Sequence, residues 1–243
     1  MPAPISYPHI PDTAQPLPLT ADKLWNVAAQ LRAAVSRQHS PWALDPAALV
    51  RTASQLEING RRITATWDLD RPVQDEAGCD VLGICETDPQ LPGMALVSVN
   101  GAMVKGRPDL ALSTIAHEIG HIVFDVPGTV GQPARCYRAI TRSPQCLSTA
   151  EHRSERRANE FMGALLVPPN ALHVRLVQCA RAEGVRMVHA PNRGRPGLRV
   201  LAADTHQEAI AGLTAVLAGD FGVSDRFIAV RLLRYRLIAG DGR

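Results

Sequence analysis

The sequence has few aromatic residues, no long apolar run and no C-x-x-C pair. Phe, Trp and Tyr make up 4% of the 243 residues, so the core must be built from Ala, Leu, Val and Ile, a composition that favours helices. No apolar run approaches the roughly 20 residues of a membrane helix. The five cysteines, an odd number in a chain of this length, indicate free thiols in a reducing compartment. A bridge or metal site made by Cys136 and Cys146 is the alternative.

The N-terminal segment also lacks the parts of a signal peptide. Residues 1–20 have no basic n-region and no apolar h-region, but they include six prolines. This composition predicts a disordered Pro-rich arm over 1–20 and a cytoplasmic protein without a membrane partner.

Lysine is missing from the C-terminal third, where the charge is concentrated. Residues 171–243 contain eleven Arg against six acids, a net charge of +5, whereas the first 170 residues carry a net charge of −2. A basic tail is compatible with nucleic-acid binding. The alternative is a solvated arginine-rich surface.

Hydrophobic periodicity predicts helices that outnumber strands. Asp45-Pro46 and the capping-box spacing of Ser148 and Glu151 mark two helix starts, and Asn170 is a candidate cap for a third helix. Asn59-Gly60 indicates a turn, and residues 126–147 are predicted to form a loop. We expect helices over 21–38, 46–56, 109–124, 149–167, 171–182, 206–219 and 225–237, strands over 62–67, 80–85 and 94–99, and a hairpin of 186–190 with 198–202.

The most specific feature is His117-Glu118-Ile119-Gly120-His121, an H-E-x-x-H motif inside a predicted helix. Side chains four residues apart share a helix face, so both imidazoles can bind one metal ion. Glu118, between them, can accept a proton from the water that the metal activates. We therefore predict His117 and His121 as ligands and Glu118 as the catalytic base.

A catalytic zinc ion usually has three protein ligands and one open position. The metzincin pattern fails, because its downstream positions hold Phe124 and Pro127. The helix after Ser148 offers Glu151, His152, Glu155 and Glu160, and its apolar stripe extends back through Glu155 and Glu151. A carboxylate on a core-facing stripe needs a strong partner. We therefore predict Glu155 as the third ligand, with a salt bridge to an arginine as the alternative. Glu151 and Asn159 are predicted to support the ligands from outside, with a contact to substrate as the alternative for Glu151.

Two segments, Ser113–His121 and Glu155–Pro168, resemble the ImmA/IrrE family of zinc metallopeptidases. The resemblance covers about residues 45–180 well and the rest loosely, and in that family the residue that matches Glu155 is the third zinc ligand. It implies an α+β fold with a zincin-like metallopeptidase domain, made of a small sheet packed on helices, over 21–182. It also implies cleavage of a helix-turn-helix repressor, and hence a role in transcription regulation or a stress response.

The predicted strand 94–99 precedes the motif helix and is a candidate for pairing with an extended substrate. Val97, Val99 and Asn100 are accordingly predicted to bind substrate. Candidates for the group that stabilises the oxyanion are Tyr137, His152 and His173. The ligand set predicts Zn²⁺, although Mn²⁺ or Fe²⁺ also suits two imidazoles and a carboxylate.

The tail supports a second interpretation. Residues 183–204 are predicted to be an insertion or linker, and 205–243 a helix-turn-helix-like unit with Phe221-Gly222-Val223-Ser224 at its turn. Arg226, Arg231, Arg234 and Arg236 lie on or near the second helix, where DNA-binding helices carry basic residues. The alternative function is therefore a DNA- or partner-binding transcription regulator with a structural or vestigial metal site.

Overall fold

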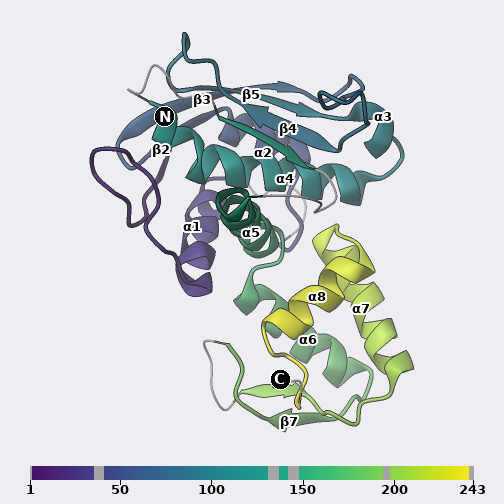
Figure 1. The fold of residues 1–243 in the computed structure, drawn as a ribbon. Coiled ribbons are helices and arrows are strands. Elements are labelled where there is room, and N and C mark those ends of the chain that lie inside the picture. Colours follow the sequence, from purple (N-terminus) through teal and green to yellow (C-terminus); the bar gives the residue numbers. More distant parts are fainter. Residues whose placement is uncertain (1, 36–40, 131–136, 142–147, 194–197, 241–243) are drawn as a thin grey trace. The chain divides into compact units, whose positions relative to one another are not determined.

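The computed structural model describes residues 2–35, 41–130, 137–141, 148–193 and 198–240. Its contacts divide the chain into two compact units, Met1–Gln38 with Leu44–Leu165 and His39–Ala43 with Leu166–Arg243 (Figure 1). Within the described ranges, no helix combines the length and the apolar character needed to span a bilayer. The predicted catalytic domain 21–182 spans the division after Leu165, so residues 166–182 lie in the second unit.

The first unit is built on a mixed six-stranded sheet in the order β1-β2-β3-β5-β4-β6. Two of its pairings are parallel, β1 with β2 and β3 with β5, and the others are antiparallel. Asn59 and Gly60, at φ 51° and 76°, form the two-residue turn between β2 and β3, which requires positive φ at both positions. The strands are β1 (Ala3–Ile5), β2 (Gln55–Ile58), β3 (Arg61–Asp68), β4 (Gly83–Glu86), β5 (Met94–Val99) and β6 (Arg138–Thr141).

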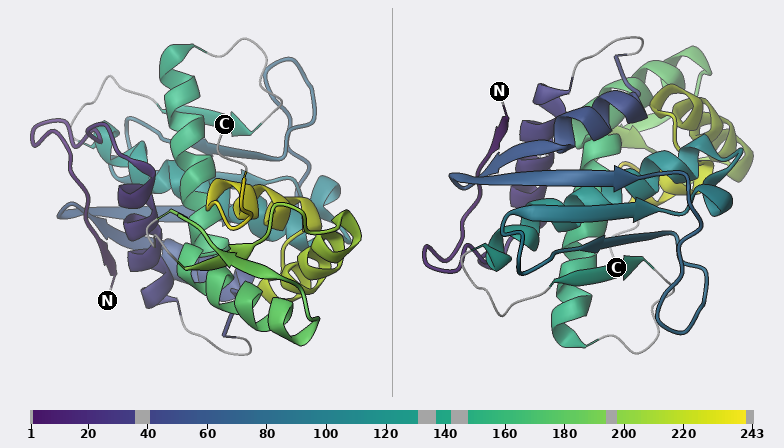
Figure 2. Two further views of the ribbon diagram at one scale, coloured as in Figure 1. Left: turned by 90° about the horizontal axis from the view of Figure 1, so that it is seen from below. Right: turned by 90° about the horizontal axis from the view of Figure 1, so that it is seen from above.

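Helices cover one face of this sheet, as the two views of Figure 2 show. Along β5 the burial alternates: Ala95 and Val97 are 0% and 1% exposed, whereas Leu96 between them is 39% exposed. This period of two is expected when only one face packs on a core. The helices are α1 (Ala21–Ala34), α2 (Pro46–Ala53), α3 (Gly101–Val104), α4 (Pro108–Phe124), the 3₁₀ turn η1 (Val126–Thr129) and α5 (Thr149–Leu166). The architecture is therefore α+β, as predicted.

The predicted helix starts at Asp45 and Ser148 are confirmed. Asp45 accepts a hydrogen bond from the N–H of Ala48 at 2.9 Å. Ser148 and Glu151 form a reciprocal capping box, in which the N–H of Ser148 donates to Glu151 at 2.7 Å and the N–H of Glu151 to Ser148 Oγ at 3.3 Å. The box fixes where α5 begins.

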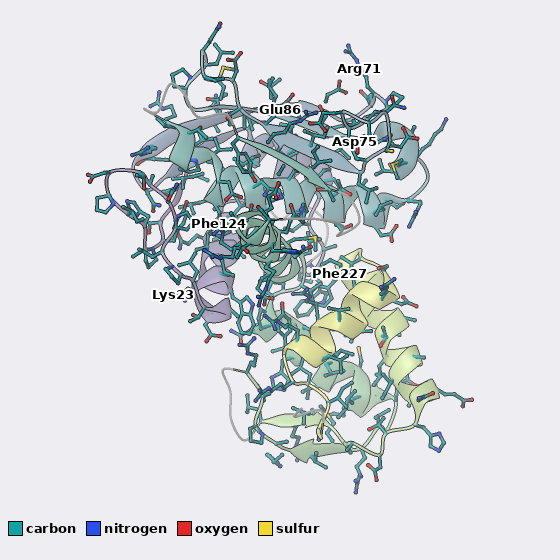
Figure 3. All side chains as sticks on the ribbon, in the orientation of Figure 1. Lys23, Arg71, Asp75, Glu86, Phe124 and Phe227 are labelled. Atoms are coloured by element: carbon teal, nitrogen blue, oxygen red, sulfur yellow. The ribbon has the colours of Figure 1, made fainter. Side chains whose placement is uncertain are left out.

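The prediction of a disordered arm over 1–20 is wrong. Residues 3–5 pair with β2, and the ring of Tyr7 packs 5.2 Å from that of Phe124, which lies in the core of the unit (Figure 3). The hydroxyl of Tyr7 also donates to the backbone oxygen of Val123 at 2.7 Å. One side of an edge strand makes no hydrogen bonds to a neighbouring strand, so proline, which lacks an N–H, is tolerated there. A proline-rich segment can therefore still join a sheet.

Two other predictions fail in the first unit. The helix predicted to reach residue 56 ends at Ala53, because Gln55–Ile58 alternates between exposed and buried residues and pairs with β3. The predicted loop 126–147 contains η1 and the strand β6, which pairs with β4. Cys79 and Cys85 are free thiols, as is Cys179 in the second unit, whereas Cys136 and Cys146 lie outside the described residues.

The second unit contains three helices and the predicted hairpin, which is part of its fold rather than a linker. The helices are α6 (Pro169–Ala182), α7 (Gln207–Phe221) and α8 (Asp225–Arg234), and the strands are β7 (Met187–His189) and β8 (Arg199–Leu201). Buried Leu176, Leu217 and Leu232 contribute to its core. Pro168, and not the predicted Asn170, occupies the N-cap of α6.

The helix pair α7–α8 has the predicted turn. Gly222 ends α7 in the left-handed conformation, and Ser224 caps α8 by accepting a hydrogen bond from the N–H of Phe227. Among the four arginines predicted near a DNA-binding surface, Arg231 is only 7% exposed and lies 5.5 Å from the ring centroid of Phe227, a residue labelled in Figure 3. Arg231 is therefore a packing residue of its unit rather than a surface contact.

Candidate metal centre

Helix α4 buries both motif histidines and the glutamate between them. His117 is 4% exposed, and Glu118 and His121 are 0% exposed. The apolar residues Ile115, Ile119 and Ile122 of the same helix are also buried, with at most 4% exposure. This broad apolar surface fixes the rotation of α4, and with it the positions of the two imidazoles.

Glu155 of α5 completes the predicted group. Its Oε2 lies 3.2 Å from Nε2 of His117, and its Oε1 lies 3.2 Å from Nε2 of His121. The two Nε2 atoms are 3.1 Å apart. The structure thus brings the three predicted ligands together, and His117, His121 and Glu155 form a possible metal-binding group.

The spacing of these atoms fits a single metal ion. With bonds of about 2.0–2.1 Å in a tetrahedral arrangement, neighbouring donor atoms lie about 3.3 Å apart. The two Nε2 atoms, 3.1 Å apart, are close to that value, and each lies 3.2 Å from a different oxygen of Glu155. With one donor atom taken from each residue, the three atoms lie within 4.8 Å of one another. Two neutral imidazoles and one carboxylate are also a donor set that zinc prefers.

A close approach of α4 and α5 makes this geometry possible. A Cβ atom added at Gly120 would lie 2.7 Å from Cα of Ala158, closer than such atoms can come. Gly120 is therefore required where the two helices cross. Because Ala158 is three residues after Glu155, the crossing also sets how far the carboxylate reaches toward the histidines.

We expect Gly120→Ala to weaken metal binding as well as stability. The added methyl must push α5 away from α4, and such overpacking costs about 1–3 kcal/mol. The separation of Glu155 from the histidines would then lower zinc affinity, as measured by competition with a chromophoric chelator. Gly212→Ala in α7 is a matched control, because no atom lies within 4 Å of its added Cβ. An unchanged zinc affinity in Gly120→Ala would refute the role of the crossing.

Glu118 is positioned by residues of two strands. Oγ of Thr141 on β6 donates to its Oε1 at 2.6 Å. A Cβ atom at Gly83 of β4 would collide with the same oxygen, so Gly83 makes room for the carboxylate. The other oxygen, Oε2, is buried and has no hydrogen-bond partner among the residues that the structure describes. Burial raises the pKa of Glu118 above its usual value, which suits a group that has to accept and release a proton.

A polar network surrounds Nδ1 of His121, the ring nitrogen that is not directed at His117 and Glu155. This nitrogen lies 3.1 Å from Oδ2 of Asp125 and 2.7 Å from the hydroxyl of Tyr137. Ser154 Oγ donates to Asp125 Oδ2 at 2.7 Å, and Arg157 donates to Oδ1 at 2.6 Å. A proton on Nδ1 that is shared with Asp125 leaves the lone pair of Nε2 free for a metal ion. Burial opposes a charge on His121, but the hydrogen bonds to Asp125 and Glu155 outweigh it and raise its pKa to about 10. The carboxylates thus favour a positive charge at His121, and a metal ion that binds Nε2 displaces the proton held there.

The predicted substrate strand is wrong. β5 is paired on both edges, with β3 and with β4, so it has no free edge for a peptide. Val97 and Val99 are core residues, and the side-chain amide of Asn100 donates to the backbone oxygens of Val73 and Val81 at 3.0 Å. These three residues therefore support the sheet and the loop beside it.

The other candidate residues also take different positions. Glu151 belongs to the capping box, and Asn159 donates to the backbone oxygen of Glu155 at 2.9 Å. Glu160, another candidate ligand on the same helix, is 8% exposed and accepts a hydrogen bond from Trp25. The two histidines proposed as oxyanion donors do not join the group: His152 is exposed, and His173, in the second unit, is hydrogen-bonded to the backbone oxygen of Arg199. Tyr137 instead binds Nδ1 of His121.

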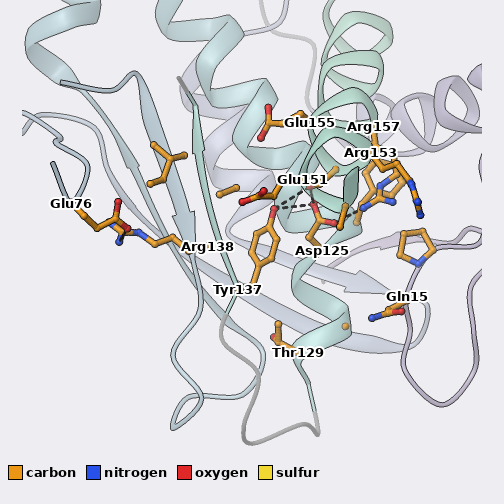
Figure 4. Close-up of a pocket in the computed structure, with 17 residues that line it drawn as sticks. Gln15, Glu76, Asp125, Thr129, Tyr137, Arg138, Glu151, Arg153, Glu155 and Arg157 are labelled. Atoms are coloured by element: carbon orange, nitrogen blue, oxygen red, sulfur yellow. Dashed lines mark hydrogen bonds and ion pairs between the residues drawn. The ribbon is translucent and has the colours of Figure 1, made fainter. Parts of the chain in front are cut away.

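A cavity of about 570 Å³ borders the metal group (Figure 4). Of the three candidate ligands, Glu155 lines it, whereas His117 and His121 do not. The cavity runs along β6, α5 and η1, with Gln15 and Pro16 of the N-terminal segment in its wall. Its lining residues are Gln15, Pro16, Glu76, Phe124, Asp125, Gly128, Thr129, Tyr137–Ile140, Ala150, Glu151, Arg153–Glu155 and Arg157. A segment of a substrate chain could therefore lie next to the candidate metal ligands.

Comparison with models of known protein families and with curated proteins finds no match to this chain. The resemblance to the ImmA/IrrE family therefore stays a prediction made from the two motifs.

Proposed function

We propose that the first unit is a zincin-like metallopeptidase domain and that the protein is a zinc-dependent endopeptidase. The observation that carries this proposal is the environment of Glu118. A carboxylate that is 0% exposed, with one oxygen that has no partner in the described part of the chain, lies beside a group of two histidines and a glutamate. Burying such a carboxylate destabilises the fold, and a role in proton transfer explains why it is there.

Each residue of the site has a separate role in the proposed hydrolysis. A bound zinc ion supplies a Lewis acid and makes water acidic at neutral pH. Glu118 accepts the proton of the attacking water through Oε2 and returns it to the leaving amine nitrogen. Thr141 holds the other oxygen of Glu118, so the free oxygen keeps its direction. Asp125 and Tyr137 hold the ring of His121 during this cycle.

A purely structural metal site is the competing function, and two features speak against it. Structural zinc sites are closed by four protein ligands, whereas the group found among the described residues has three members. A structural site also has no use for a buried carboxylate such as Glu118, whose Oε2 has no partner within the described ranges. The α7–α8 pair leaves a DNA- or partner-binding role for the second unit as a separate prediction.

Strand β6 replaces β5 as the candidate site for an extended peptide. It is the last strand of the sheet and, within the described part of the chain, pairs only with β4. Its residue Thr141 contacts Glu118, and Tyr137, just before the strand, contacts His121. A peptide that adds to this edge would therefore run past the catalytic groups. A helix-turn-helix repressor as its source rests on the family resemblance alone.

The test is cleavage that depends on the metal. The purified full chain, loaded with zinc, is incubated with a proteome-derived peptide library, and new termini are identified by mass spectrometry. We expect discrete cleavage products that a chelator abolishes and added zinc restores. A protein that binds zinc but leaves the whole library intact would overturn the peptidase proposal.

A further inference from the structure

The cavity beside the metal group holds more hydrogen-bond donors than the protein uses. Each of its carboxylates is already paired within the first unit: Glu76 with Arg138, Asp125 with Arg157 and Ser154, Glu151 with the N–H of Ser148, and Glu155 with His117 and His121. The acidic groups of the cavity are therefore not free to attract a basic ligand.

Arg153 differs from these groups. It lines the cavity, is exposed, and makes no hydrogen bond or ion pair with any described residue. Arg157 lies four residues further along α5, and residues at this spacing share a helix face (Figure 4). Arg157 is already paired, because one of its amino nitrogens donates to Asp125, and its Nε is buried out of reach of a ligand. Among the described residues, the guanidinium group of Arg153 is thus the donor left over on this side of the cavity.

We propose that Arg153 binds an acidic side chain of the substrate close to the bond that is cut. This inference rests on the peptidase function proposed above. A guanidinium group binds a carboxylate through charge-assisted, often paired hydrogen bonds. Because the cavity touches Glu155 and an extended chain advances about 3.3 Å per residue, an Asp or Glu within a few residues of the scissile bond can reach it.

The experiment compares cleavage preferences of the zinc-loaded full chain and two charge-reversal variants. Arg153→Glu changes the proposed contact. Arg156→Glu is the matched control, because Arg156 is exposed on the same helix but does not line the cavity. The library peptides have amidated C-termini, so that only side-chain carboxylates are tested.

We expect Asp or Glu to be enriched at one position near the bond cut by the wild type. Arg153→Glu should lose this enrichment and reduce kcat/KM for an acidic peptide about tenfold, mainly through KM, because a charge-assisted contact is lost. It should also cut the matched lysine peptide better than the wild type does, and Arg156→Glu should behave like the wild type.

Three results would overturn the inference while the peptidase function stands: wild-type cleavage without acidic preference, an unchanged preference in Arg153→Glu, or an equal loss in Arg156→Glu. A wild-type enzyme that cuts no peptide would instead overturn the peptidase function, and the inference with it.

Discussion

Glu118→Gln is expected to reduce kcat/KM by about 10²–10⁴-fold, the usual contribution of a general acid–base group, without loss of zinc. Glutamine has nearly the same shape and can still accept the hydrogen bond from Thr141, but it cannot take a proton from water. Cleavage of a library-derived peptide gives the rate, and elemental analysis gives the zinc content. The two measurements together separate lost chemistry from lost metal.

The same substitution should stabilise the metal-free protein. A neutral amide costs less to bury than the carboxylate of Glu118, whose Oε2 has no partner. We expect a gain of about 1 kcal/mol in the free energy of unfolding at pH 7, or about 2–4 °C in Tm for a chain of this size. Because burial raises the pKa of Glu118, the wild type loses stability as the pH rises through that value. The gain should therefore shrink as the pH falls below 4.5, where the carboxyl group becomes protonated in the unfolded chain as well as in the folded one.

Two results would contradict the role of Glu118. Cleavage at the wild-type rate by Glu118→Gln would exclude it as the base. A variant that is less active and also less stable would indicate that Glu118 supports the fold. Thr141→Val is an informative comparison, because it keeps the carboxylate but removes the hydrogen bond that directs it.

The metal ligands could be predicted from the sequence because helical periodicity determines their relation. His117 and His121 are four residues apart on a helix, and Glu155 lies on the apolar stripe of the next motif helix, so local geometry placed each on a core-facing side. The distances that bring the three together depend on Gly120 and Ala158, whose contact is tertiary. The sequence shows the glycine inside the motif, but it does not show that this glycine packs against Ala158 of α5.

The residues around the ligands could not be predicted in the same way. Asp125 is four residues after His121, a spacing that could have suggested it, but Thr141 and Gly83 reach Glu118 only because β4 and β6 are neighbours in the sheet. Strand order depends on pairings between distant segments, and alternation within one strand does not reveal its neighbours. The same limit explains the wrong role given to β5, whose bounds were predicted correctly but whose central position was not.

Glu155→Gln is expected to abolish zinc binding in the micromolar range. Changes to residues behind the ligands typically reduce metal affinity 10–100-fold, so the loss of a direct anionic ligand should exceed about 100-fold. Zinc should then no longer raise the Tm of the variant, whereas a ligand at about 100 times its Kd stabilises the wild type by roughly 2.7 kcal/mol. Chelator competition and thermal unfolding with and without zinc measure these effects, and neither depends on knowledge of the substrate.

Glu151→Gln is the matched control for this experiment. Glu151 lies one turn earlier on the same helix and is exposed, and its carboxylate caps the helix at Ser148. Its replacement should reduce stability by about 1 kcal/mol at most and leave the zinc affinity unchanged. Equal zinc affinities in Glu155→Gln and the wild type would mean that α5 supplies no ligand, and the proposed catalytic site would then lack its third protein donor.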